Sequence, residues 1–74
     1  MQEYIINVSE IEDLQTLRDT DALDLIFTKA ERTIVGGGAV VLQRKSPNAK
    51  PERFEEFTNA ADLADYKKGV YKYL

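Results

Sequence analysis

No crosslink of the usual kinds is available to hold this chain folded. Its 74 residues contain no cysteine and no histidine, which excludes a disulfide framework and a zinc finger. A chain of this length has room for one hydrophobic core, so we expect a single compact domain over residues 1–74. Such a core seldom leaves more than about 3–5 kcal/mol of net stability, and self-association would be one way to supplement it.

The composition is that of a folded, mildly acidic protein. An apolar fraction of 43%, 31% charged residues and a net charge of -3 are ordinary for a globular chain. No segment approaches the roughly 20 apolar residues that cross a bilayer, and the first residues lack the basic start of a signal peptide. We therefore expect no contact with membranes and a cytoplasmic location.

Residues 3–8 predict a strand, because the segment is short and rich in β-branched and aromatic side chains. Ser9 and Glu12 follow with the spacing of a capping box, in which the hydroxyl and the carboxylate each satisfy a free helix amide. Apolar residues then recur every three positions, so a first helix is expected over about 10–19.

A second helix is expected from Ala22 to about Arg32, with Thr20 or Asp21 as its cap. Its apolar residues form a broad face, and its acidic start and basic end suit the helix dipole. A strand over residues 25–27 is the alternative, but the caps and charges favour the helix.

Gly36, Gly37 and Gly38 form the most conspicuous local feature of the sequence. A triplet of this kind could let a phosphate or a partner approach the backbone, so it is our candidate for a backbone-approach loop. Phosphate loops, however, run from a strand into a helix, whereas this triplet is expected to run from a helix into a strand. A tight chain reversal is therefore favoured, or a hairpin between residues 33–35 and 39–41.

Residues 39–44 predict a second strand, residues 46–51 a loop and residues 52–58 a third strand. Phe54 is expected to point inward. Phe57 is out of phase with it, which requires a bulge or a covered second face of the sheet.

Asn59 is expected to cap a last helix that runs to about Tyr73. Gly69 follows two lysines, which also suits a helix end with residues 70–74 as a strand. We favour one helix that contains Gly69 at a cost of about 1 kcal/mol relative to alanine. The predicted order is therefore β-α-α-β-β-α, an α+β domain with its helices on one face of a short antiparallel sheet.

Charge is divided unevenly along the chain. Residues 1–31 carry eight acidic and two basic side chains, a net charge of -6, whereas residues 32–74 carry eight basic and five acidic ones, a net charge of +3. The two parts could form opposite faces that steer association with another molecule. We favour compensation between packed elements, because most surface charge is simply solvated.

The residue types present argue against catalysis. A serine triad lacks its histidine, and Asp19, Asp21 and Asp24 lack the glycine and glutamate of an EF-hand calcium loop. We therefore assign no catalytic residue, no cofactor and no metal ligand, and we expect that the protein is not an enzyme. An enzyme that depends on paired carboxylates is the remaining alternative of that class.

Candidate binding residues gather in the basic part of the chain. They are Arg44, Lys45, Lys50, Arg53, Lys67, Lys68 and Tyr71. The element order is also that of a winged helix, so the basic loop Arg44–Arg53 could contact nucleic-acid phosphates. Against this alternative, the helix that should enter the groove of DNA begins with aspartates, which repel phosphate.

We therefore expect a non-catalytic interaction or adaptor module that acts through protein–protein contacts, with a partner or as a homo-oligomer. The apolar run over residues 34–42 could present an edge strand for pairing with another chain. A nucleic-acid-binding, winged-helix-like domain is the alternative.

Overall fold

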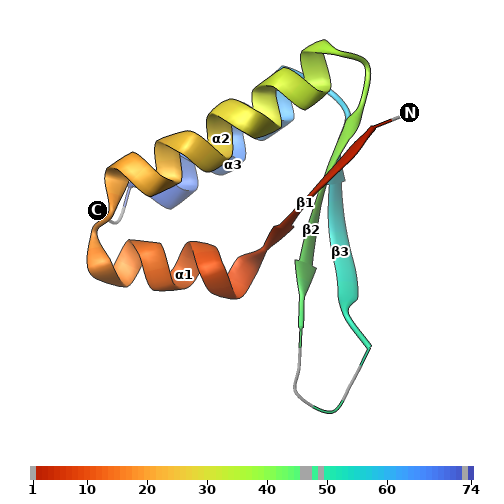
Figure 1. The fold of residues 1–74 in the computed structure, drawn as a ribbon. Helices are drawn as coiled ribbons and strands as arrows, with labels where there is room; N and C mark the ends of the chain where they lie inside the picture. Colours follow the sequence, from red (N-terminus) through yellow and green to blue (C-terminus); the bar gives the residue numbers. More distant parts are fainter. Residues whose placement is uncertain (1, 46–47, 49, 73) are drawn as a thin grey trace.

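The structure, a computed structural model, describes residues 2–45, 48, 50–72 and 74, apart from the side chain of Phe54. Its elements are β1 (Glu3–Asn7), α1 (Val8–Leu17), α2 (Thr20–Val35), β2 (Ala39–Arg44), β3 (Glu52–Phe57) and α3 (Ala60–Tyr71). The predicted α+β class and the order β-α-α-β-β-α are confirmed (Figure 1). Within the described ranges, no helix is both long and apolar enough to cross a membrane.

The sheet is mixed, with the strand order β1-β2-β3. β2 pairs antiparallel with β3 as expected, but it pairs parallel with β1, so the prediction of a wholly antiparallel sheet is wrong. The reason is the connection: α1 and α2 return the chain to the end where β1 began, and such a crossover produces a parallel pair. β2 is therefore central and paired on both sides. The prediction of a free edge strand over residues 34–42 is accordingly wrong.

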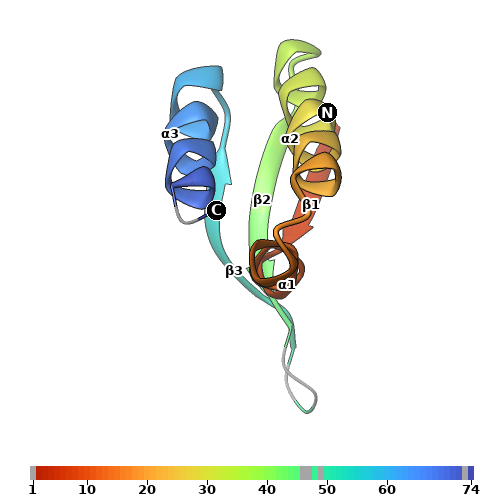
Figure 2. The same ribbon diagram turned by 90° about the vertical axis from the view of Figure 1, so that its left-hand side faces the viewer.

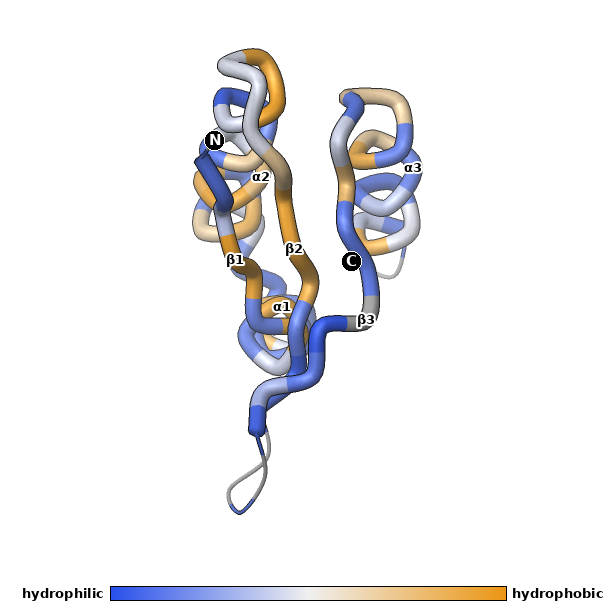
Figure 3. Tube along the Cα trace, turned by 90° about the vertical axis from the view of Figure 1, so that its right-hand side faces the viewer, coloured by the Kyte–Doolittle hydropathy of each residue, from blue (hydrophilic) through white to orange (hydrophobic). Residues whose placement is uncertain are grey.

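All three helices cover the same face of the sheet. Figure 2 shows α2 and α3 side by side over the strands with α1 at one end, and Figure 3 shows the opposite face with no helix on it. The buried core draws on every element: Ile6, Ile11, Leu23, Phe27, Ala30, Val40, Leu42, Phe57, Leu63 and Val70. One contiguous core therefore lies between the helical layer and the sheet.

The central strand is buried on both faces. Val40 belongs to the core, and Val41, which points to the face without helices, is only 1% exposed. By register, Glu3 of β1 and Arg53 of β3 share the face of Val41, and their side chains form an ion pair of 2.9 Å. This pair spans the central strand and helps to cover it.

The start of α1 differs from its prediction. The helix begins at Val8, directly after β1, so Ser9 lies inside it and the predicted capping box with Glu12 is wrong. Asn7 occupies the cap position but makes no side-chain cap bond. Its Oδ1 instead accepts a hydrogen bond of 3.1 Å from the side chain of Gln43 in β2. The oxygen that could cap α1 is therefore bonded to the neighbouring strand.

Aspartate and asparagine caps start the other two helices. Asp19 accepts a hydrogen bond of 3.1 Å from the Ala22 amide, so the cap of α2 lies before the expected Thr20 or Asp21. The strand alternative over residues 25–27 is wrong, because these residues lie inside α2.

The cap of α3 is confirmed, because Asn59 accepts a hydrogen bond of 2.9 Å from the Asp62 amide. α3 continues through Gly69 to Tyr71, which confirms one helix and contradicts a strand over residues 70–74. The expected extension to Tyr73 lies outside the described residues.

The glycine triplet is a chain reversal between α2 and β2. Gly36 follows the last residue of α2, and Gly37 adopts a φ of 87°, a conformation that favours glycine. The hairpin alternative is wrong because residues 33–35 are helical. A backbone does approach this loop closely, but it is that of Gln2 in the same chain, whose carbonyl accepts a hydrogen bond of 2.9 Å from the Ala39 amide.

β3 contains a bulge, which is one of the two explanations offered above for the unequal phase of Phe54 and Phe57. Glu55 pairs with Leu42, whereas Arg53 pairs with the next residue, Gln43, so position 54 is the extra residue. Phe57 is buried in the core. The inward orientation predicted for Phe54 lies outside the described part of the chain, as does much of the loop predicted over residues 46–51.

Candidate functional site

The predicted basic binding surface falls into two groups. The first surrounds the loop between β2 and β3 and comprises Arg44, Lys45, Lys50 and Arg53. The second lies on α3 and comprises Lys67, Lys68 and Tyr71. Figures 1 and 2 show the ends of β2 and β3 that flank this loop well away from α3, so the fold does not bring the two groups together.

Several of these basic side chains are already paired with carboxylates. The pairs are Arg44 with Glu12 at 3.1 Å, Arg53 with Glu3 at 2.9 Å, and Lys67 with Glu31 at 3.9 Å. Each pair joins the acidic residues 1–31 to the basic residues 32–74, which is the compensation favoured from the sequence. The side chains are exposed, so each pair contributes only about 0–1 kcal/mol.

Tyr71 is integrated into the fold. Its ring packs edge-on against Phe27 with the centroids 6.0 Å apart, and Lys67 Nζ lies 5.6 Å from the centroid of the Tyr71 ring. The Tyr71 hydroxyl donates a hydrogen bond to Asp24. Burial raises the pKa of Tyr71 well above its usual value, and the hydrogen bond and the charge of Asp24 raise it further.

This pKa predicts a loss of stability in alkali. The folded protein holds the Tyr71 proton more tightly than the unfolded chain, in which tyrosine titrates near 10.0. Tyr71 therefore makes its full contribution to the free energy of unfolding below pH 10, and this contribution falls as the pH rises above 10. We expect Tyr71→Phe to make this fall shallower in urea denaturation series run at several pH values from neutral to strongly alkaline. Equal slopes for the variant and the wild type would contradict the assignment.

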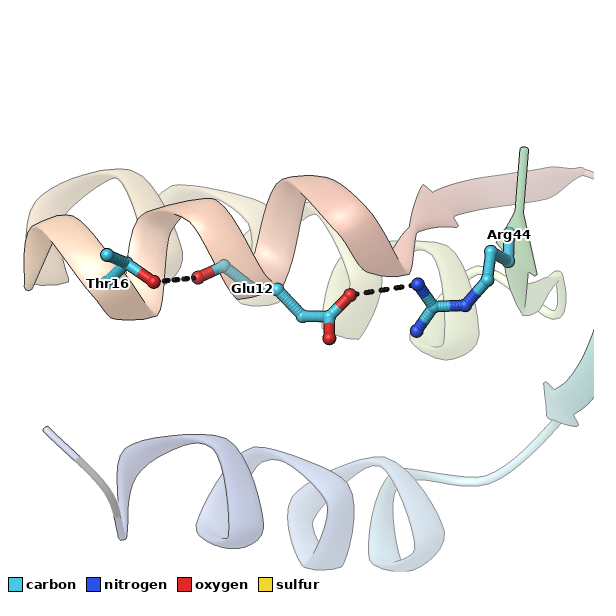
Figure 4. A network of polar contacts seen from close by, with 3 residues as sticks. All are labelled: Glu12, Thr16 and Arg44. Atoms are coloured by element: carbon cyan, nitrogen blue, oxygen red, sulfur yellow. Dashed lines mark hydrogen bonds and ion pairs between the residues drawn. The ribbon is translucent and has the colours of Figure 1, made fainter. Parts of the chain in front are cut away.

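A groove lies between α1 and α3. Its volume is about 500 Å³, and its lining includes the apolar side chains of Val8, Ile11 and Val70 and the carboxylates of Glu12 and Asp65. Figure 4 shows Arg44 reaching Glu12 of α1 from the end of β2. We call this hollow the α1–α3 groove.

The groove continues toward the sheet. A second hollow of about 390 Å³ lies between α3 and β3 and shares Asp65 and Tyr66 with the first. At the other end, Gln15 of α1 donates a hydrogen bond of 3.0 Å to the Val70 carbonyl. That carbonyl belongs to the last turn of α3, where helical partners run out, so Gln15 both caps α3 and ties the two walls together.

The groove is acidic. Glu55 and Asp62 line the second hollow, and among the described residues no basic one lines either hollow. The pKa of Tyr66 reflects this negative charge. Burial raises that pKa, and the carboxylates of Glu12 and Glu55 raise it further, because they disfavour a negative charge on the Tyr66 oxygen.

The carboxylates of the chain are all at its surface. All thirteen aspartate and glutamate side chains lie within the described ranges and are exposed. In the same ranges, no three acidic side chains converge to hold a metal ion.

Sequence reasoning missed the groove. The α1–α3 groove is lined by residues between 8 and 15 and between 65 and 70, and the second hollow by residues 55–57 and 62–66; each of these segments has a local explanation as core, solvated charge or helix. The one available signal was Gly69, an interior helix position at which glycine is unfavourable.

No protein-family model, curated protein sequence or solved structure matches this chain. What the groove does must therefore be argued from its own geometry and charge.

Proposed function

We propose that this chain is a non-catalytic protein-interaction domain that binds a basic segment of a partner protein in the α1–α3 groove. The observation that carries the proposal is an apolar floor bounded by carboxylates. The half-buried Val8 and Tyr66 contribute apolar surface to the groove, and Glu12 and Asp65 contribute negative charge to the same hollow.

The groove has an apolar part and an acidic part, and each requires a matching part in the partner. Apolar side chains that leave water on this floor supply most of the affinity, as they do in binding sites generally. Lysine or arginine side chains opposite the carboxylates raise the association rate and reject acidic segments. Arg44 does not block such a partner, because an exposed ion pair like that with Glu12 contributes little stability.

Self-association and nucleic-acid binding stay predictions. A second copy could place its own loop, with the exposed Lys45 and Lys50, against the groove, so the oligomeric state must be measured in parallel. Nucleic acid would have to use the same loop, where Arg44 and Arg53 already contact carboxylates.

The test is a titration of the isotope-labelled protein, followed by amide NMR shifts, with a short synthetic peptide of leucine and lysine. We expect shifts at Ile11, Gln15 and Gly69, and none with the same peptide in which glutamate replaces lysine. Asp65→Asn should weaken the affinity about two- to fivefold, the effect of removing one exposed charge pair.

Asp13→Asn is the matched control, because Asp13 is an exposed residue of α1 that does not line the groove. It should leave the affinity unchanged. Absence of shifts with the lysine peptide, or shifts confined to Lys45 and Lys50 that appear with duplex DNA, would overturn the proposal. If the free protein sediments as a dimer in which the groove is occupied, the basic segment belongs to a second copy of this chain.

A further inference from the structure

Gly69 stands where the fold itself does not require a glycine. It lies inside α3 in helical backbone, and its φ is not in the left-handed region. A Cβ atom built at this position would meet no atom within 4 Å, so no crowding excludes a side chain. Glycine nevertheless lowers the helix equilibrium constant about fivefold relative to alanine.

The missing side chain leaves the α1–α3 groove open. Gly69 lines the groove beside Tyr66 and Val70, on the wall that faces α1. How closely two helices can approach is set by the side chains at their contact, and a glycine there lets another backbone come nearest. Gly69 is therefore suited to a close crossing with a bound segment.

The walls of the groove also restrict the conformation of that segment. Both walls are helices, whose backbone groups are used within α1 and α3 themselves, and the Val70 carbonyl is taken by Gln15. An extended segment would find no ladder of backbone partners there. A segment that buries its backbone between two helices must satisfy its own N–H and C=O groups, as a helix does.

We infer that the occupant of the α1–α3 groove is a basic amphipathic helix of a partner protein, which crosses α3 at Gly69. Its apolar stripe lies on the half-buried Val8 and Tyr66, above the buried Ile11 and Val70, and its lysines or arginines face Glu12 and Asp65. The inference rests on the proposed function and adds the conformation of the ligand and its point of closest contact.

The test compares Gly69→Leu with the wild type, using a leucine–lysine peptide whose leucines recur at helical spacing. We expect Gly69→Leu to lower the affinity at least tenfold by filling the crossing point. Circular dichroism should show that the peptide gains helix on binding, and the same peptide with a central proline should not bind. Ala64→Leu is the matched control: Ala64 is an exposed residue of α3 outside the groove lining, so the affinity should not change.

Gly69→Ala separates binding from folding. It should raise the folding equilibrium constant about fivefold in urea denaturation while it weakens peptide binding. If the wild type binds the peptide but Gly69→Leu and Gly69→Ala bind equally well, or if the peptide binds without forming helix, the inference is overturned and the proposed function stands. If the wild type binds none of the leucine–lysine peptides, both are overturned.

Discussion

The Phe27→Ala variant is expected to be largely unfolded at room temperature. Phe27 is 0% exposed at the centre of the core, and its ring lies 5.9 Å from that of Tyr66 and 6.0 Å from that of Tyr71, measured between centroids. Truncation of a buried phenylalanine costs about 3–5 kcal/mol, because apolar contacts are lost and a cavity is left behind. A domain of this size has about that much stability in total.

Far-UV circular dichroism and urea denaturation measure this effect. Leu25→Ala is the control on the same helix: Leu25 is 57% exposed, so its truncation should change the free energy of unfolding by no more than about 0.5 kcal/mol. A cooperative unfolding transition for Phe27→Ala, displaced by less than about 1 kcal/mol, would show that the aromatic cluster is not the centre of the core.

The second large effect is expected at Gly38. A Cβ atom there would lie 2.4 Å from the Gln2 carbonyl oxygen and 2.8 Å from Thr33 Cγ2, so the backbone before β1 would have to move. That movement breaks the hydrogen bond from the Ala39 amide to Gln2, next to the first paired residues of β1 and β2. We expect Gly38→Ala to lower the free energy of unfolding by about 2–3 kcal/mol, as overpacking does.

The neighbouring glycines supply graded controls for this prediction. Gly37→Ala meets no atom within 4 Å but retains a φ of 87°, which costs about 1–2 kcal/mol for a residue with a side chain. At Gly36 the nearest atom to an added Cβ lies 3.4 Å away, an ordinary contact, so Gly36→Ala should have the smallest effect. Any other order of the three variants in urea denaturation would contradict the geometry described for this turn.

The predictions that succeeded rest on interactions within a few residues. Asn59 caps α3 through a bond to Asp62, and residues 39–44 form a strand with the predicted bounds. The predictions that failed depend on distant parts of the chain. The capping box at Ser9 was displaced because Asn7 bonds Gln43, and the direction of β1 follows from where α2 ends.

The candidate groove shows the same limit more strongly. Ile11 and Val70 come together only when α1 and α3 pack on one sheet, and Glu12 and Asp65 look like ordinary solvated charges until that packing is known. The basic residues, which are conspicuous in sequence, are in part neutralised by carboxylates from the other half of the chain. A charge split along the sequence therefore did not predict a charge split in space.

The parallel pairing of β1 with β2 has a consequence for how the chain folds. Asn7 and Gln43, which bond across these strands, lie 36 positions apart in the sequence. Residues 8–38 lie between the two strands, so both helices must be in the chain before β1 and β2 can pair, and this pairing closes a long loop. Until Ala39 and the residues after it follow, α1 and α2 have no sheet on which to bury their apolar faces. A fragment that ends before Ala39 should therefore be cut readily by proteases, whereas residues 1–74 together should resist them.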